Sequence, residues 1–357
     1  MANTYGENLK LTIFGTSHGP EIGMTLAGIP AGLRVDADKL QQFLNRRAPG
    51  QNAWSTQRKE SDIPNFQSGL KDGMTDGSTI TAVIRNENVR SKDYADLQYI
   101  PRPGHADFAA WMKYGLDYDM AGGGPFSGRM TAPMCIAGGL CKQWLEAKGI
   151  RIWAHIQSIG DVEAYICADL MEHVEKAIDP DFPVFGALEA EAMKQRIQQA
   201  KDNGDSVGGI IQCVITGVPA GIGDCLWGGM ESHIAQIIYG IPAVKGVEFG
   251  EGFGFADACG SFVNDAYGIV DGKVQTISNF CGGILGGISN GMPIYFRVAI
   301  KPTPSIAKPQ KSVNLQTMEE VTLQIKGRHD PCIVPRAVPV VEAAAAIAIY
   351  DMMLGGI

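Results

Sequence analysis

Apolar positions along the chain repeat with two periods, which predict where strands and helices form. Residues 293–300 alternate between apolar and other side chains, the two-residue period of a half-buried strand. Residues 10–14 form a shorter apolar segment, which we also interpret as a strand, and it runs directly into a glycine-bounded loop at 15–19. The side chains on the apolar side of the first strand are Ile294, Phe296, Val298 and Ile300.

Helical spacing first occurs after Asp36. An aspartate commonly caps a helix N-terminus because its carboxylate accepts hydrogen bonds from unpaired backbone N–H groups. Leu40, Phe43 and Leu44 then fall on one face, and the Pro-Gly pair at 49–50 ends the predicted helix.

Four later segments also have helical patterns, each with its own character. Residues 134–147 are almost all small or apolar, which predicts a buried helix at close packing distance, whereas 188–201 carry charges on one face like a surface helix. Residues 232–238 predict a short helix, and 339–354 predict an alanine-rich buried one. Buried helices combined with alternating strands favour a layered α+β fold. No linker or repeat divides the chain, so we expect one domain over residues 1–357.

Composition and charge narrow the classes of protein that this chain can represent. With 45% hydrophobic and 19% charged residues, 357 residues can bury a large core, which excludes intrinsic disorder. The net charge of −8 argues against binding to nucleic acid, which requires basic surface. An anionic ligand would therefore need a local cluster of arginines.

The sequence predicts a cytoplasmic protein that does not bind membranes. Residues 1–9 lack the pattern of a signal peptide, and the apolar segment 338–354 contains Glu342 and Asp351 and is short for a membrane span. The eight cysteines are scattered without a Cys-x-x-Cys pair, which is typical of reduced thiols and predicts no metal site.

Three of the six histidines, His18, His105 and His329, lie in glycine- or proline-containing loops beside other ionisable residues. A neighbouring glycine lets a ligand approach the backbone closely, and an imidazole can exchange a proton near neutral pH. Each loop alone could be an ordinary turn. Because the pattern occurs three times, we interpret these loops as candidate parts of one active site.

Two glycine-rich segments are candidates for binding phosphate. Residues 122–131 have the Gly-x-x-x-x-Gly spacing of a phosphate loop, but Arg129 and Met130 replace its Lys and Ser or Thr, which argues against a P-loop NTPase. A glycine turn that opens a helix fits better, either as an anion site or as a purely structural turn. Residues 282–291 are followed by Lys301, Thr303 and Ser305, which would suit a cofactor with a flat ring and a phosphate tail.

Five arginines lie at loop or helix-end positions beside these motifs. Guanidinium groups match the geometry of carboxylates and phosphates, so we expect these arginines to converge on one polyanionic small molecule. The alternative is that they are solvated surface charges. They are Arg47, Arg58, Arg102, Arg129 and Arg328.

Taken together, the motifs resemble those of the chorismate synthase family nearly from end to end. The resemblance begins with Gly-x-Ser-His-Gly at 15–19, Arg-Arg-x-Pro-Gly at 46–50 and Thr-Gln-Arg at 56–58. The other motifs are Arg-Pro-Gly-His-Ala-Asp at 102–107, the glycine turn at 122–131, Ala-Val-Lys-Gly-Val-Glu at 243–248, Gly-Gly-Ile-Leu-Gly-Gly-Ile-Ser at 282–289, Lys-Pro-Thr at 301–303 and Gly-Arg-His-Asp-Pro-Cys at 327–332. So many ordered motifs at similar spacing make the resemblance specific.

The resemblance implies a lyase of the shikimate pathway, which serves aromatic amino acid biosynthesis. Such an enzyme eliminates phosphate from 5-enolpyruvylshikimate 3-phosphate in a trans-1,4 sense to give chorismate. It requires reduced FMN, with NADPH as the indirect reductant. Two sources of the reduced flavin stay open: the protein reduces its own flavin, or it depends on an external flavin reductase. The implied fold is a β-α-β sandwich, with helices between two antiparallel sheet layers, assembled as a homotetramer. The alternative left open is a family member that binds flavin or polyanionic ligands with little or no turnover.

The resemblance also implies roles for individual residues. His18 would protonate the departing phosphate, His105 would lie at the flavin N1/O2 edge, and Asp330 would accept the second proton near flavin N5, helped by Ser17 and Ser127. The five arginines named above would bind the substrate anions. The residues implied to line the flavin are Pro125, Phe126, Ser127, Pro242, Ala243, Gly286, Lys301, Pro302, Thr303, Pro304, Ser305 and Arg328.

Several of these positions differ from the residues usual in the family. The family usually has Arg-Ser where this chain has Pro125 and Phe126, and Asn where it has Pro242. Pro242 offers neither a side-chain amide nor a backbone N–H, so flavin contacts should differ most here. Because the proton-transfer residues and the five arginines are kept, we expect an active enzyme.

Overall fold

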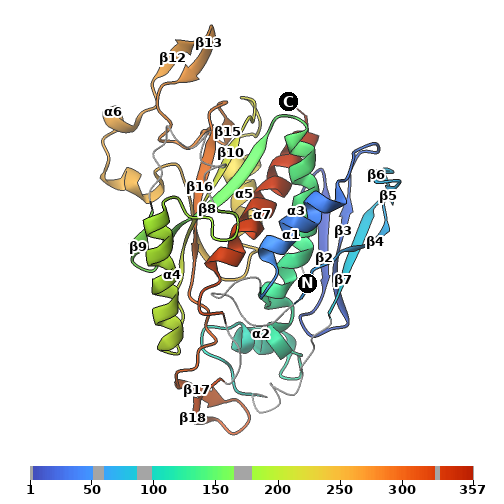
Figure 1. The fold of residues 1–357 in the computed structure, drawn as a ribbon, viewed down its shortest axis with the longest axis vertical. Helices are drawn as coiled ribbons and strands as arrows, with labels where there is room; N and C mark the ends of the chain where they lie inside the picture. The colour runs from blue at the N-terminus through green and yellow to red at the C-terminus, as the bar shows by residue number, and fades with distance from the viewer. Residues whose placement is uncertain (1–2, 51–59, 87–98, 165–178, 326–329, 357) are drawn as a thin grey trace.

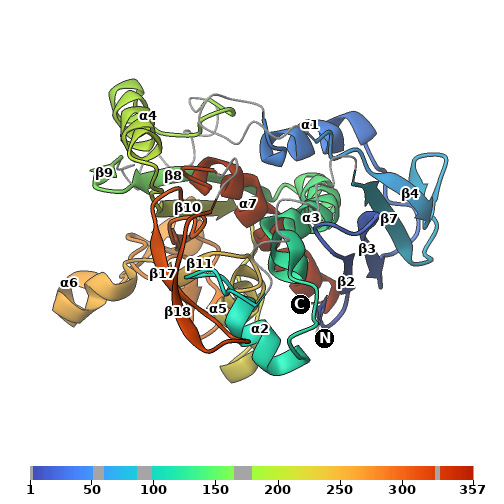
Figure 2. The same cartoon turned by 90° about the horizontal axis from the view of Figure 1, so that it is seen from below.

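Two five-stranded antiparallel sheets lie on either side of a layer of helices (Figure 1). The structure is a computed structural model that describes residues 3–50, 60–86, 99–164, 179–325 and 330–356. Viewed from below, helices α1, α3 and α7 separate the sheet that contains β2, β3 and β7 from the sheet that contains β8 and β10 (Figure 2). This arrangement confirms the predicted α+β sandwich with helices between two sheet layers.

The first sheet is built mostly from the N-terminal part of the chain. Its strand order is β1-β2-β3-β7-β4, and each neighbouring pair is antiparallel. The predicted strand at 10–14 is confirmed as β2. The strands are β1 Thr4–Tyr5, β2 Lys10–Gly15, β3 Glu21–Ala27, β4 Asn65–Ser68 and β7 Ile80–Arg85, and a small ribbon is formed by β5 Leu70–Lys71 and β6 Met74–Thr75.

The second sheet has the order β11-β16-β10-β8-β9, and it is also antiparallel throughout. The predicted strand at 293–300 is confirmed as β16, and its four alternating apolar side chains are buried. The strands are β8 Arg151–Ile159, β9 Val162–Glu163, β10 Gly209–Thr216, β11 Val244–Phe249 and β16 Ile294–Ile300. Three ribbons complete the strands: β12 Tyr267–Val270 with β13 Lys273–Thr276, β14 Ile284–Leu285 with β15 Ile288–Ser289, and β17 Gln310–Asn314 with β18 Glu319–Leu323.

The central layer is held together by very close helix packing. A Cβ atom placed on Gly138 of α3 (Thr131–Glu146) would lie 2.3 Å from the Cβ of Ala343 in α7 (Val334–Leu354). A Cβ on Gly139 would lie 2.6 Å from a methyl group of Leu40 in α1 (Ala37–Arg47). Glycine and alanine at these contacts therefore allow three helices to fit between the sheets, as the small residues of 134–147 predict.

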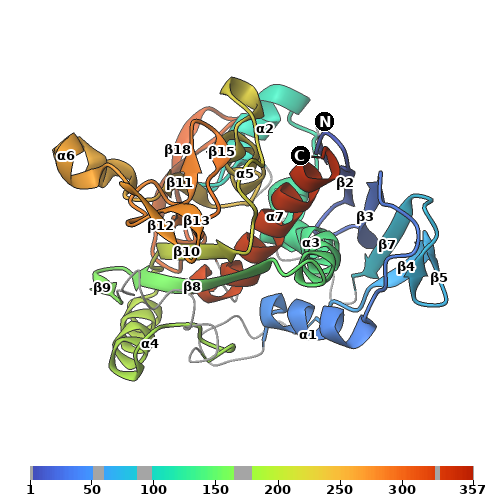
Figure 3. The same ribbon diagram turned by 90° about the horizontal axis from the view of Figure 1, so that it is seen from above.

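The remaining helices lie around this central layer. Seen from above, α5 packs beside α7 (Figure 3). The predicted surface helix α4 packs against β8 and the edge strand β9 of the second sheet. Helix α2 and the ribbon β17–β18 occupy the end of the molecule opposite the C-terminus of α7 (Figure 1). Their bounds are α2 Asp107–Tyr114, α4 Ala187–Asp202, α5 Met230–Ile238 and α6 Gly260–Val263, and 3₁₀ turns occur at Ala121–Phe126, Gly128–Met130, Leu226–Gly228 and Gly252–Asp257.

The prediction for the last helix was wrong at its N-terminus. We expected α7 to begin at residue 339, but it begins at Val334, and Pro339 lies inside it. Pro335 is in the first turn, where a proline costs little because the first N–H groups of a helix lack helical partners. Helix α7 has the length and composition of a membrane span, but 89% of its most apolar window is buried inside the protein.

Candidate active site

A cavity of about 700 Å³ opens at the end of the molecule where α7 begins. Its wall combines loops from separate parts of the chain: the segment before α2, the glycine turn before α3, the segment before β11, the segment after β16 and the start of α7. The predicted site residues that line it are Arg47, Arg102, His105, Pro125, Phe126, Ser127, Arg129, Pro242, Ala243, Lys301, Thr303, Pro304, Ser305 and Asp330.

Other predicted site residues lie elsewhere. Ser17 and His18 are not part of the cavity lining, although they contact residues that are. Gly286 and Pro302 are also outside the lining, and Gly286 connects the short strands β14 and β15. Arg58, Arg328 and His329 lie outside the described residues.

The glycine turn joins the His18 loop to the cavity. Gly122, Gly123 and Gly124 have φ values of +60°, +89° and +52°, a conformation that residues with side chains rarely adopt. A Cβ on Gly122 would lie only 1.9 Å from the imidazole of His18, so this ring packs directly against the turn. Ser127 follows the three glycines, and its hydroxyl donates to the Ser17 hydroxyl at 3.3 Å and accepts from the backbone N–H of Arg129. The glycine turn therefore packs against the His18 ring, and the serine that follows it is hydrogen-bonded to Ser17.

His105 lies in a loop that is fixed at both of its ends. Before it, Arg102 forms a bidentate ion pair with Asp107, the first residue of α2, at 2.7 and 2.8 Å. The segment that follows β16 makes the other contacts. Ser305 Oγ shares a hydrogen bond of 2.7 Å with His105 Nε2, and the Lys301 ammonium donates to the Gly104 carbonyl. These contacts position an imidazole at the cavity beside a cation and a hydroxyl group.

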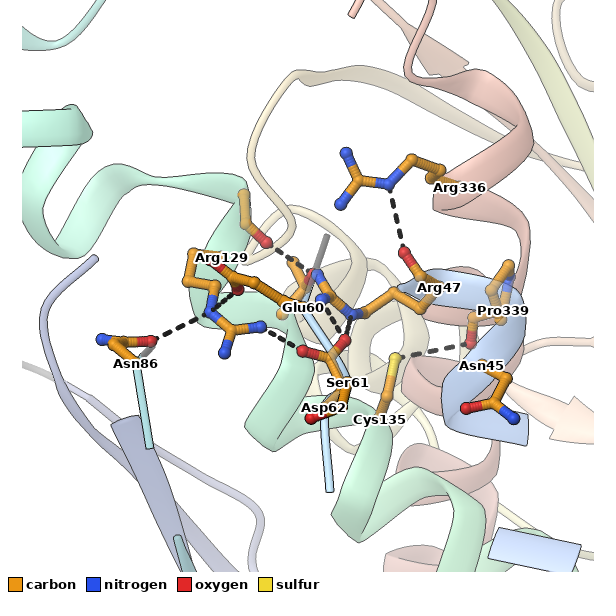
Figure 4. Close-up of polar contacts among 12 residues, drawn as sticks. Asn45, Arg47, Glu60, Ser61, Asp62, Asn86, Arg129, Cys135, Arg336 and Pro339 are labelled. Carbon is orange, nitrogen blue, oxygen red and sulfur yellow. Dashed lines mark hydrogen bonds and ion pairs between the residues drawn. The ribbon is translucent and has the colours of Figure 1, made fainter. Parts of the chain in front are cut away.

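Arg47 and Arg129 meet at a carboxylate that we did not predict (Figure 4). Arg47, in the last turn of α1, donates its Nε to Asp62 Oδ2 at 2.8 Å. Arg129 donates its Nη1 to the other oxygen of Asp62, while its Nε lies 2.7 Å from Glu60 and 3.1 Å from the Asn86 side-chain oxygen. Two of the five predicted arginines therefore lie side by side, and each has a carboxylate partner within the chain.

Asp330 also has a cationic partner, Arg336, which the sequence analysis missed. Arg336 lies in the first turns of α7 and lines the cavity. Its Nη1 donates to Asp330 Oδ2 at 2.6 Å, and its Nε donates to the backbone carbonyl of Arg47 at 3.1 Å (Figure 4). Through Arg336, the predicted proton acceptor is connected to the predicted anion site.

Three ionisable residues that were not predicted, Glu60, Asp62 and Arg336, form ion pairs with predicted site residues. Glu60 and Asp62 belong to the dense charge run 58–62, and Arg336 lies eight residues after Arg328. The charge run was the available signal, because basic residues followed directly by acidic ones next to a predicted anion site indicate internal ion pairs. In the described part of the chain, no group of three or more His, Cys, Asp or Glu could hold a metal ion.

Comparison with known proteins gives a consistent result over almost the whole chain. A family model described as chorismate synthase matches residues 9–354. The chain is 48% identical to the chorismate synthase of Lancefieldella parvula, covering 99% of this chain and 96% of that protein. It is 45% identical to that of Methanobrevibacter smithii, covering 99% and 97%. It also superimposes on a crystal structure of a chorismate synthase with a TM-score of 0.74 and 28% identity, covering 98% of this chain and 92% of the other.

The fold and the site together define an α+β enzyme with a cavity for small anionic molecules. Ionisable groups from widely separated segments of the chain surround this cavity, which is typical of an active site. The comparisons identify the family: the chain belongs to the chorismate synthase family, whose members are lyases of the shikimate pathway.

Proposed function

We propose that this chain converts 5-enolpyruvylshikimate 3-phosphate into chorismate and phosphate by a trans-1,4-elimination that depends on reduced FMN. The observation that carries the proposal is the cavity itself. It brings His105, Ser127 and Asp330 together with the arginines at 47, 102 and 129 in a chain that matches the family over 346 residues, 9–354. Similarity to enzymes over the full length does not favour the alternative of a binding protein without turnover.

The residues of the cavity fit FMN. A volume of about 700 Å³ lies within the range of ligand pockets and leaves space for a second small molecule. Pro125, Phe126, Pro242 and Ala243 offer apolar and backbone surface for a flat ring. Reduced FMN, when bound, would supply electron density that promotes loss of phosphate from a carbon without a neighbouring carbonyl.

Lys301, Thr303 and Ser305 would hold the phosphate tail of the cofactor. Burial lowers the pKa of Lys301, and the charge of Lys245, which also lines the cavity, lowers it further. Two neighbouring ammonium groups that repel each other favour the arrival of a dianion between them. This pair is therefore the best-placed cationic feature for the phosphate.

The proton-handling residues lie on different sides of the glycine turn. His105 and Asp330 line the cavity, and we propose that His105 stabilises the anionic edge of the cofactor while Asp330 accepts the proton from the substrate. His18 lies against Gly122, which lines the cavity, and we propose that it protonates the departing phosphate, helped by the hydrogen-bonded pair Ser17 and Ser127. Arg336, whose Nη1 lies 2.6 Å from Asp330 Oδ2, would hold this carboxylate in place.

We propose that the chain assembles as a homotetramer. Support comes from residues 252–277, which extend from the body of the molecule and end in the ribbon β12–β13 (Figure 1). This arm has large apolar side chains that are exposed in the single chain: Phe253, Phe262, Tyr267, Ile269, Val274 and Ile277. Such a surface is typical of an interface between subunits. Analytical ultracentrifugation should give the mass of four chains, and an Ile269→Asp/Val274→Asp variant should give a lower mass.

We also propose a cytoplasmic location, with the flavin reduced by an external reductase that uses NADPH. Buried unpaired thiols support a reducing compartment: Cys135, Cys141, Cys213 and Cys332 are free and inaccessible. Burial raises the pKa of Cys135 to about 12, which keeps this thiol protonated and unreactive.

Phosphate release under anaerobic conditions tests the proposed function. The enzyme is mixed with 5-enolpyruvylshikimate 3-phosphate and FMN reduced by dithionite, and phosphate and chorismate are measured over time. The proposal expects both products in equal amounts, and none when FMN is omitted. Tight binding of substrate and flavin without either product would instead support a binding protein.

A further inference from the structure

Not every residue of the ion pairs near the cavity is part of its lining. Arg47, Arg129 and Glu60 line the cavity, whereas Asp62 does not. In Figure 4, the Asp62 carboxylate lies between the guanidinium groups of Arg47 and Arg129. All three residues are buried: Asp62 is 1% exposed, Arg47 2% and Arg129 8%.

Asp62 uses both of its oxygens to bridge two like charges. Oδ2 accepts from the Nε and Nη2 of Arg47, and Oδ1 accepts from the Nη1 of Arg129. The two arginines come from different elements, the last turn of α1 and the 3₁₀ turn Gly128–Met130. Two buried guanidinium groups repel each other, and a carboxylate between them offsets this repulsion.

Asp62 remains charged in this position. Burial by itself would raise its pKa, but the charges of Arg47 and Arg129 and their hydrogen bonds outweigh burial and hold the pKa below its ordinary value. The bridge is therefore intact at neutral pH. It does not block the cavity, because the carboxylate approaches the arginines from a position outside the lining.

Glu60 provides a contrast on the cavity side. Its carboxylate lies 2.7 Å from the Nε of Arg129, and the residue is part of the cavity wall. A substrate anion that binds Arg129 must share this region with Glu60, whereas it does not compete with Asp62. The two carboxylates, two residues apart in the sequence, should therefore affect substrate affinity in different ways.

We propose that Asp62 is a positioning residue that holds the guanidinium groups of Arg47 and Arg129 side by side as one clamp for an anionic group of the substrate. This inference rests on the proposed function, because it assumes that these arginines bind 5-enolpyruvylshikimate 3-phosphate. Asp62 itself does not touch the substrate. It fixes the separation and direction of the groups that do.

The test measures substrate and flavin affinity separately by isothermal titration in the full-length protein. The key variant is Asp62→Glu, which keeps the charge but moves the carboxylate by one methylene group. A misplacement of about 1 Å at a recognition site can cost about 100-fold, so the Kd for substrate should rise by about 10- to 100-fold. Flavin affinity should stay within about twofold, because Lys301 and the ring-lining residues are separate from this bridge.

Two further variants separate positioning from charge. Asp62→Asn removes the charge from the bridge and should weaken substrate binding at least as much as Asp62→Glu. Glu60→Gln removes one negative charge from the cavity side and should bind substrate as tightly as wild type or more tightly. Asp205→Asn, at an exposed pair with Lys308, is the control for a charge change outside the cavity lining.

Each result has a definite meaning. If Asp62→Asn fails to fold, the folded Asp62→Glu variant decides the question. Substrate affinity of Asp62→Glu equal to wild type, with melting temperature unchanged, would overturn the proposal. So would an equal loss of substrate and flavin affinity, which would indicate a general structural role. If the wild-type protein does not bind this substrate, the proposed function fails instead, whatever the variants do.

Discussion

Removal of the buried carboxylate of Glu342 should strongly destabilise the fold. Glu342 lies within α7 with 1% of its side chain exposed, and it accepts hydrogen bonds from Arg46 at 2.8 and 2.9 Å and from Lys142 at 2.7 Å. It also accepts from the backbone N–H of Ala154 at 3.2 Å. One carboxylate thus connects α7 to the central-layer helices α1 and α3 and to strand β8 of the second sheet.

The expected magnitude follows from the pKa of Glu342. Burial alone would raise this pKa, but the charges of Arg46 and Lys142 lower it from 4.5 to about 2. That difference corresponds to about 3 kcal/mol of folding free energy at neutral pH. Because the folded-state pKa is depressed, this stability is present above pH 4.5 and is lost as the pH falls toward 2. Loss of one partner of a buried ion pair costs about 3–5 kcal/mol, and the partly buried Arg46 and Lys142 place the expected cost at the lower end of this range.

Urea unfolding at several pH values measures this effect. At pH 7, the free energy of unfolding of Glu342→Gln should be about 3 kcal/mol below that of wild type, and the difference should shrink between pH 4.5 and 2. The matched control is Asp205→Asn, whose pair with Lys308 is 50% and 40% exposed and should contribute at most about 1 kcal/mol. A Glu342→Gln variant within 1 kcal/mol of wild type at pH 7 would refute the reasoning.

Three more predictions concern the site and the chain end. His18→Ala and His105→Ala should each reduce the turnover number by about 100-fold or more, the usual scale for a general acid or base, and a near-normal rate would remove that histidine from the mechanism. Gly122→Ala should also reduce turnover because its Cβ would lie 1.9 Å from His18, whereas Gly149→Ala, with a similar positive φ of +81° and open space around it, should not. Asp351→Asn should lower the free energy of unfolding by about 1–3 kcal/mol, because the buried Asp351 carboxylate accepts three backbone N–H groups of residues 7–9 at 2.7–2.8 Å; an unchanged urea midpoint would contradict this.

Local sequence signals predicted much of the fold. Asp36 caps α1 as expected, with its side chain accepting from the Lys39 N–H at 3.0 Å, because capping depends on residues that are close in sequence. The start of α7 was not predicted, because prolines at 335 and 339 indicate a helix boundary locally. Burial among the two sheets and α3 outweighs the hydrogen bond that Pro339 cannot donate.

The site was predicted less completely, for a physical reason. Sequence patterns identified arginines that suit an anion, and three of the five, Arg47, Arg102 and Arg129, line the cavity. They did not show which carboxylate each arginine pairs with, because Asp62 is 15 residues from Arg47 and 67 from Arg129. Partner choice at such separations depends on how the sheets and helices pack, and one sequence read locally does not contain that information.

A crystal structure with FMN and substrate tests the central claim most directly. The account predicts that the isoalloxazine ring lies in the cavity against Phe126 and Ala243, with its edge at His105, and that the substrate lies between the ring and the guanidinium groups of Arg47 and Arg129. Flavin bound outside this cavity, or substrate with no contact to either arginine, would contradict the account.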